Sequence, residues 1–243
     1  MMAEKFSAAG SRVALVARNG PELQQLADAV GGAAYPADLA DPAQLRDLVA
    51  RVEDDGGPVD VLVNNAGLET ARHLVDLTAD QVEAVVRLNL LAPVELTRQA
   101  LPGMLARGTG HIVAMSSLAG VATFPGFSVY AATKAGLTHF MSGVRADIGD
   151  GPVRTTVVEL GPVVTSMLDR AYDYRPTERS FERMYRLGLL VELPVEPVAA
   201  AVVAAVASGR RHVRLPRRAA LVAAVSETPR RAVELLLRPG HRV

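Results

Sequence analysis

Residues 111–160 read HIVAMSSLAGVATFPGFSVYAATKAGLTHFMSGVRADIGDGPVRTTVVEL. His111–Met115 is a short, mainly apolar run of strand length, and Val153–Leu160 is a second run that is rich in β-branched residues. Between them, Ser128–Ile148 has the apolar spacing of a helix. A strand, a helix and a strand in this order predict two parallel strands joined by a crossover helix.

The same alternation continues in both directions along the chain. We expect strands at 13–17 (a buried one), 33–36, 59–63 and 212–215, and helices over 20–30, 41–53, 197–207 and 219–237. A long helix should run from Thr78 to about Leu105 and kink near Pro93, while 161–195 looks irregular apart from a short helix over 177–187. Since we see no linker or repeat, residues 1–243 should form one α/β domain with a Rossmann-like, doubly wound parallel sheet.

Composition excludes several classes of protein. The chain has 243 residues, of which 49% are hydrophobic and none is cysteine, so disulfides and thiolate chemistry are excluded. The five histidines show no metal-ligand spacing, and we predict no metal site. There is no apolar run of about 18 residues, and the first residues are too polar for a secretory signal. These features predict a cytoplasmic protein.

Tyr130 and Lys134 form the most informative pair. Four residues apart on a helix, they lie on one face, one turn from each other. A phenol ionises near pH 10 in water, and a nearby ammonium should lower that pKa by favouring the phenolate. Because the chain holds only two lysines, Lys5 and Lys134, a chance match is improbable. The pair therefore predicts an acid/base group that works near neutral pH.

Ser117 follows the strand at 111–115, at the sheet edge where ligands of parallel sheets bind. Its hydroxyl could hold a substrate oxygen beside Tyr130. Together with Asn64-Asn65-Ala66-Gly67 after the strand at 59–63, this segment resembles the classical short-chain dehydrogenase/reductase family. The interval of thirteen residues before Tyr130 selects Ser117 rather than Ser116.

The resemblance spans nearly the whole chain and implies a role for each matched residue. Tyr130 would be the general acid/base, Lys134 would lower its pKa and bind the nicotinamide ribose, Ser117 would orient the substrate oxygen, and Asn89 would hold a relay water. The implied cofactor-binding residues are Asp38, Leu39, Asn65, Ala66, Gly67, Tyr130, Lys134, Gly161, Val163 and Thr165. Two alternatives stay open, since the asparagines can equally stabilise the sheet and Asp38 can simply form a turn.

Cofactor choice depends on the end of the strand at 13–17. A carboxylate there would bind a ribose 2′-hydroxyl, but this chain has Ala17 followed by Arg18. A guanidinium suits a 2′-phosphate. We therefore predict NADP(H) in preference to NAD(H), with Arg18 as a binding residue; the alternative is an ordinary loop arginine.

The chain departs from the family at its beginning. Residues 3–9 look like the end of a helix, and no Gly-rich phosphate turn precedes the strand at 13–17. One hypothesis is that the true start lies upstream of Met1 and supplies a strand and that turn. The other is a genuine short form, which pairs the strands at 13–17 and 59–63 directly or acts without a cofactor. Without compensation, we expect marginal stability and weak cofactor binding.

Two segments concern the substrate and partners. Residues 161–195 occupy the substrate-loop position, and their apolar side chains favour a hydrophobic ketone or alcohol. Residues 209–243 hold nine Arg and two Glu, which suggests either a solvated helix face or a surface for anionic lipid. Nucleic acid is an improbable partner, and the family likeness implies a homo-oligomer. The sequence thus predicts an NAD(P)(H)-dependent oxidoreductase, with a non-catalytic binding or oligomer partner as the alternative.

Overall fold

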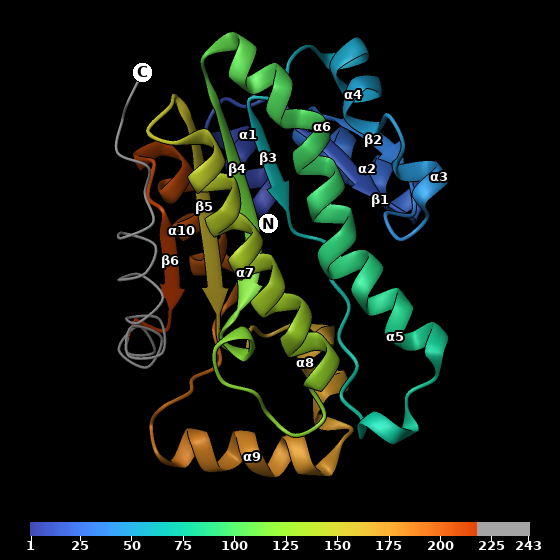
Figure 1. Cartoon of the computed structure of the whole chain (residues 1–243), viewed down its shortest axis with the longest axis vertical. Coiled ribbons are helices and arrows are strands. Elements are labelled where there is room, and N and C mark those ends of the chain that lie inside the picture. The colour runs from blue at the N-terminus through green and yellow to red at the C-terminus, as the bar shows by residue number, and fades with distance from the viewer. Residues whose placement is uncertain (218–243) are drawn as a thin grey trace.

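The computed structural model describes residues 1–217 of the chain (Figure 1). Its strands are β1 (Ala14–Ala17), β2 (Ala33–Pro36), β3 (Val61–Asn64), β4 (Gly110–Ser117), β5 (Val153–Leu160) and β6 (His212–Leu215). Every pairing between them is parallel. The predicted α/β architecture with a Rossmann-like parallel sheet is therefore confirmed.

Helices cover both faces of the larger sheet, which has the order β3-β4-β5-β6 (Figure 1). On one face lie α6 (Ala92–Arg107) and α7 (Ser128–Ile148), which bury Met104, Leu137 and Met141 against Ile112 and Val157. On the other lie α1 (Met2–Ala8) and α10 (Val195–Ser208), which pack against Val113 and Val158. β4 and β5 are thus enclosed on both faces, as their apolar runs predicted.

The remaining strands form a separate sheet, in which β1 pairs only with β2. The helices α2 (Gly20–Val30), α3 (Pro42–Leu45) and α4 (Leu48–Gly56) accompany this pair. Within residues 1–217, β1 and β3 form no ladder with each other, so the hypothesis that these two strands pair directly is wrong. β1 is also less buried than predicted, because it has one strand neighbour and both its ends are exposed.

Two helical segments differ from the sequence-based expectation. The helix expected over 41–53 is broken, because Asp47 adopts φ 54°, a left-handed conformation that ends α3 and starts α4. The long helix comprises α5 (Ala79–Val86), a π-helical turn η2 (Arg87–Leu91) and α6. Pro93 lacks the N–H that would bond the carbonyl of Asn89, so the helix widens just before the proline instead of merely kinking.

The segment expected to be irregular is mostly helical. It contains α8 (Ser166–Tyr172), which was not predicted, and α9 (Arg175–Arg186), close to the helix predicted over 177–187. Both lie beyond the carboxyl ends of the strands, at the lower end of the molecule in Figure 1. Two short 3₁₀ turns complete the description, η1 (Leu74–Asp76) and η3 (Leu118–Gly120). The helices predicted over 219–237 lie outside the described residues.

Candidate active site

Three neighbouring strands of the larger sheet end at the same edge, and each contributes predicted site residues. Asn65, Ala66 and Gly67 follow β3, Ser117 ends β4, and Gly161 follows β5. Carboxyl ends of parallel strands form the ligand-binding edge of such folds. α7 crosses this edge and carries Tyr130 and Lys134.

Ser117, Tyr130 and Lys134 come together at this edge. The Ser117 Oγ accepts a bond from the Ala119 N–H at 3.1 Å and donates to the Leu160 carbonyl at 3.4 Å, and the Ser117 side chain interacts with the Tyr130 phenol. The Lys134 Nζ lies 5.6 Å from the centre of the Tyr130 ring. Ser116, the neighbour rejected on spacing, is buried and donates to the Lys134 main-chain oxygen at 3.1 Å. Ser116 therefore fixes α7 to β4, while Ser117 faces the phenol.

The Lys134 ammonium is held inside the protein. The residue is 4% exposed, and its Nζ donates to the Met115 carbonyl at 2.8 Å. Burial lowers its pKa from 10.5 to about 8. An ammonium has three donors, so this single bond leaves Lys134 able to bind a further acceptor at the strand edge.

The pKa of Tyr130 differs from the sequence-based expectation. Burial raises this pKa, the hydrogen bond from Ser117 opposes the rise, and the Glu69 carboxylate adds to it. The net shift is therefore upward, opposite in direction to the lowering predicted from Lys134. In this arrangement Tyr130 is a protonated phenol, which is the form that donates a proton.

Asn89 lies in the π-helical turn and is fully buried. Its Oδ1 accepts from the Leu68 N–H at 2.8 Å, and its Nδ2 donates to the Leu68 carbonyl at 2.7 Å and to Thr133 Oγ1 at 3.2 Å. Asn89 thereby joins the turn after β3 to the helix that carries Tyr130. These contacts occupy the Asn89 amide, and they hold the turn after β3 against α7.

The two adjacent asparagines at the end of β3 have different surroundings. Asn64 is buried and donates to Thr97 Oγ1 at 3.4 Å, so it stabilises the sheet against α6. Asn65 is exposed at the strand end. A Cβ on Gly67 would lie 3.5 Å from both Asn89 Oδ1 and Lys134 Nζ, which puts this turn directly against the site.

The residues predicted to bind the adenosine end lie on the smaller sheet. Arg18 follows β1 and is exposed, as a phosphate contact would require. Asp38 follows β2, but its Oδ1 accepts from the Ala40 N–H at 2.9 Å, the geometry of a simple turn. Leu39 is half-buried against the core shared with α6 and α7. Of these three residues, Arg18 is exposed and the other two are half-buried.

The segment after β5 supplies the predicted nicotinamide contacts. The Gly161 N–H donates to the Leu215 carbonyl at 2.8 Å, and Val163 forms a parallel bridge with Leu193. Thr165 is exposed at the start of α8, and its Oγ1 donates to the Val163 carbonyl at 3.2 Å. These contacts fix the path of the chain from the strand edge into α8.

Aromatic side chains cover the site. Phe127, Leu168, Ala171, Phe181 and Leu190 form a buried cluster against which the Tyr130 ring packs. The Phe127 and Tyr130 ring centres are 5.4 Å apart, and those of Phe124 and Phe181 are 4.9 Å apart. We call α8, α9 and the residues between them the lid.

Sequence reasoning missed an ion pair between the lid and the sheet edge. Glu69 follows the turn after β3, its side chain is 5% exposed, and its Oε1 accepts from Arg170 Nε at 3.0 Å. A buried carboxylate needs a partner. The acidic residue two positions beyond Gly67 was a signal, but its partner lies 101 residues away and no local pattern identifies it.

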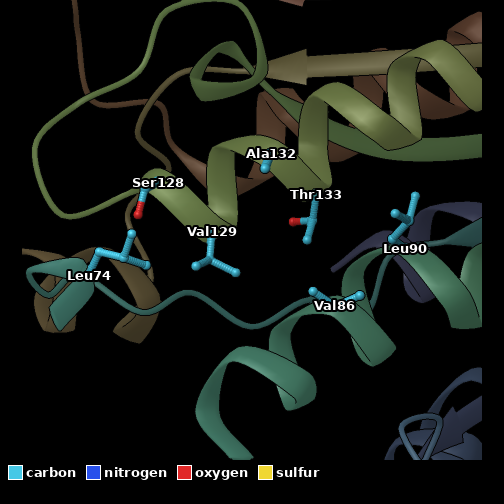
Figure 2. Close-up of a pocket in the computed structure, with 7 residues that line it drawn as sticks. All are labelled: Leu74, Val86, Leu90, Ser128, Val129, Ala132 and Thr133. Carbon is cyan, nitrogen blue, oxygen red and sulfur yellow. The ribbon is translucent and has the colours of Figure 1, made fainter. Parts of the chain in front are cut away.

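An apolar hollow lies beside α7. It has a volume of about 350 Å³, and Figure 2 shows Val129 and Ala132 of α7 facing Val86 and Leu90 across it. Leu74 of η1 closes one end and is 55% exposed. Because Tyr130 and Lys134 are not among its lining residues, this apolar groove is separate from the strand edge that carries the candidate site.

The residues at the strand edge fit the nicotinamide ribose of NAD(P)(H). Lys134 retains donors beside Gly67, where a side chain is absent and a ligand can approach the backbone. Residues 1–13 contain no Gly-rich turn, so the residues that fit the cofactor are those at the strand edge. In residues 1–217, no helix is long and apolar enough to cross a bilayer, and no group of three or more His, Asp or Glu is arranged to hold a metal ion.

Comparison with known proteins identifies the family. The short chain dehydrogenase family model matches residues 1–175. Dehydrogenase/reductase SDR family member 7B of Bos taurus is 34% identical over 176 residues, which are 68% of this chain and 54% of the relative. A ketoacyl reductase, HetN, of a Nostoc species is 38% identical over 151 residues, covering 60% of this chain and 53% of the relative. The chain thus spans about half the length of these curated relatives.

Solved structures agree with this assignment. A short-chain dehydrogenase from Sphingobium yanoikuyae in complex with NADPH has a TM-score of 0.81 and 26% identity, and the match covers 100% of this chain and 92% of that one. A serine dehydrogenase complexed with NADP⁺ has a TM-score of 0.75 and 27% identity, with 88% of each chain covered. Fold, strand-edge geometry and sequence similarity agree, and the chain belongs to the short-chain dehydrogenase family, whose members are NAD(P)-dependent oxidoreductases.

Proposed function

We propose that this chain transfers a hydride between NADP(H) and an apolar carbonyl/alcohol pair, with Tyr130 as the general acid/base. The observation that carries the proposal is the grouping of the Ser117 hydroxyl, the Tyr130 phenol and the Lys134 ammonium at one strand edge. When bound, NADP(H) supplies or accepts the hydride.

In the direction of reduction, Tyr130 donates its proton to the carbonyl oxygen, and its raised pKa keeps that proton in place beforehand. Ser117 orients the same oxygen through its hydroxyl. Lys134 binds the nicotinamide ribose and steadies the phenolate that remains after proton transfer. Asn89 braces the turn after β3 against α7, which fixes Tyr130 relative to the strand edge.

The aromatic cluster supports an apolar substrate. Phe127 and Phe181 pack beside Tyr130, so a substrate that enters under the lid meets rings rather than charges. For the cofactor, the exposed Arg18 supports NADP(H). Two of the similar solved structures contain NADPH or NADP⁺, whereas a similarly folded one contains NAD. Binding through Asp38, Leu39, Asn65, Ala66, Gly161, Val163 and Thr165 stays part of the proposal.

The proposal is tested by NADPH-dependent reduction of a panel of aryl ketones, compared with small aliphatic ketones and with Tyr130→Phe. We expect turnover of aryl ketones that Tyr130→Phe abolishes. The competing proposal is a non-catalytic binding partner. Calorimetric titration separates the two: no NADPH binding, by this chain or by a version extended upstream, would support the non-catalytic role.

We further propose that the chain forms homo-oligomers and that it is cytoplasmic. The exposed apolar groove beside Val129 is compatible with self-association (Figure 2). Sedimentation of the parent and of Val129→Glu tests this, and a parent that sediments as a monomer contradicts it. The proposed lipid contact of the Arg-rich segment falls mainly on residues 218–243, which lie outside the described residues.

A further inference from the structure

The ion pair between Glu69 and Arg170 joins the edge of the larger sheet to α8. Glu69 belongs to the sheet edge, and Arg170 lies in the middle of α8. The Arg170 side chain is 52% exposed, whereas that of Glu69 is 5% exposed. The carboxylate is therefore the buried anchor, and the guanidinium reaches it from the outside.

The anchor is fixed by the body of the protein rather than by the lid. Leu68, the residue before Glu69, has both its N–H and its carbonyl bonded to the buried Asn89 side chain. Asn89 in turn donates to Thr133 on α7, which lies about one helical turn after Tyr130. Glu69 and Tyr130 are thus positioned by the same buried asparagine.

The α8 helix depends on this pair for its polar attachment to the sheet edge. It also makes apolar contacts through Leu168 and Ala171 in the cluster beside Tyr130, and at its C-terminal end the Tyr172 hydroxyl donates to Glu192 Oε1 at 2.9 Å. α9 has its own polar attachment, because Thr177 Oγ1 donates to the Pro125 carbonyl at 2.7 Å. Loss of the Glu69–Arg170 pair should therefore loosen α8 more than α9.

We propose that Glu69 and Arg170 form a latch that holds α8 closed over Tyr130, which makes both of them positioning residues of the reaction. This inference rests on the proposed function, in which Tyr130 is the acid/base. The latch should act through its charges as well as through the contact itself. With the lid closed, Arg170 balances the Glu69 carboxylate beside Tyr130; with the lid open, that carboxylate faces the site alone.

The charges of the latch should shift the pKa of Tyr130 in a defined direction. The Glu69 carboxylate raises the pKa of Tyr130. Removing its charge should lower the apparent pKa of the Tyr130-dependent step, and removing the Arg170 charge should raise it. The other titratable or charged groups around Tyr130 and its cluster are Lys134 on α7, Tyr172 on α8, Tyr185 on α9 and Glu192, which accepts from Tyr172.

The primary experiment needs no turnover. Hydrogen–deuterium exchange of the full chain is compared for the parent, Glu69→Gln, Arg170→Met and Arg170→Lys. The matched control is Glu95→Gln, which breaks the exposed Glu95–Arg98 pair within α6. We expect several-fold faster exchange over residues 166–172 in Glu69→Gln and Arg170→Met, partial recovery in Arg170→Lys, and parental exchange in Glu95→Gln.

Folding is monitored in the same spectra through β5, whose exchange should stay parental. If either single variant fails to fold, the double variant Glu69→Gln/Arg170→Met carries the test, because it leaves no buried carboxylate without its partner. Parental exchange over 166–172 in folded Arg170→Met would overturn the latch.

The pH profile of kcat/KM supplies the second readout. Opposite shifts of the apparent pKa in Glu69→Gln and Arg170→Met support the charge component, and equal or absent shifts overturn it. If the parent chain shows no activity at all, the proposed function fails, while the exchange experiment still decides whether the latch exists.

Discussion

The Lys134 ammonium lies 5.6 Å from the centre of the Tyr130 ring and donates its hydrogen bond to the Met115 main-chain oxygen. β4 therefore sets the position of the cation, and α7 sets that of the phenol. The spacing of four residues places both on one helix face, but the strand decides where the charge resides. Burial at that place has a measurable consequence for stability.

Lys134→Met should remove a pH dependence of unfolding. The Lys134 pKa is about 8 in the folded protein and near 10.5 when unperturbed. Between these values the unfolded chain binds more protons, so this group makes the free energy of unfolding rise with pH, by about 2 kcal/mol from pH 8 to pH 10. Above pH 10 the raised pKa of Tyr130 acts in the opposite sense. Urea unfolding at several pH values measures both slopes.

The control for this experiment is Lys5→Met, which removes the only other lysine of the chain. Lys5 forms a surface pair with Glu196 at 3.2 Å, and its loss should leave the parental slope intact. Identical slopes in the parent and Lys134→Met between pH 8 and pH 10 would contradict the buried position of the ammonium.

Gly120→Ala should destabilise the protein by about 1–3 kcal/mol through overpacking. A Cβ at Gly120 would lie 2.9 Å from the Ala135 nitrogen and 3.0 Å from the Lys134 carbonyl carbon, both of them backbone atoms of α7. Gly143→Ala in the same helix meets nothing within 4 Å and should stabilise by about 0.5–1 kcal/mol. Thermal unfolding compares the two, and a tolerated Gly120→Ala would refute the close approach of η3 to α7.

Asn89→Ala should cost about 2–4 kcal/mol, since it leaves Leu68 and Thr133 without their buried partner and creates a cavity. Gln24→Ala removes an exposed hydrogen bond to Asp28 and should cost less than about 0.5 kcal/mol. Urea midpoints decide between them. Equal, small losses would mean that the turn after β3 does not depend on Asn89.

Arg18→Glu should lower NADPH affinity by about tenfold or more, because it replaces a cation with an anion that repels a 2′-phosphate. NADH affinity should hold or improve, since a carboxylate suits the ribose hydroxyl. Arg179→Glu, an exposed arginine of α9, makes the same charge change away from β1 and serves as the control. Calorimetry with both cofactors measures the effect, and a preference of the parent for NADH would reject the role of Arg18.

The larger sheet and the grouping of Ser117, Tyr130 and Lys134 were predictable because periodicity and the strand-edge rule act locally. The π-helical turn at Asn89 was not, because Pro93 indicated only a kink. The Glu69–Arg170 pair escaped prediction because its partners lie 101 residues apart. The break between β1 and β3 likewise depends on which strands meet in space, which no single strand pattern encodes.

The raised pKa of Tyr130 has the same origin. Helical spacing predicted an effect of Lys134 alone, whereas burial under the lid and the Glu69 carboxylate act on the phenol from distant parts of the chain. Local pattern thus identifies the candidate acid/base group, and long-range packing shifts its pKa.

Transfer of label from NADPH deuterated at nicotinamide C4 tests hydride transfer with Tyr130 as the acid most directly. With an aryl ketone, mass spectrometry should find deuterium at the carbinol carbon for the parent, using one labelled face of the cofactor, and no labelled alcohol for Tyr130→Phe. Bound NADPH without labelled alcohol from any ketone, or equal labelling by the parent and Tyr130→Phe, would contradict the account.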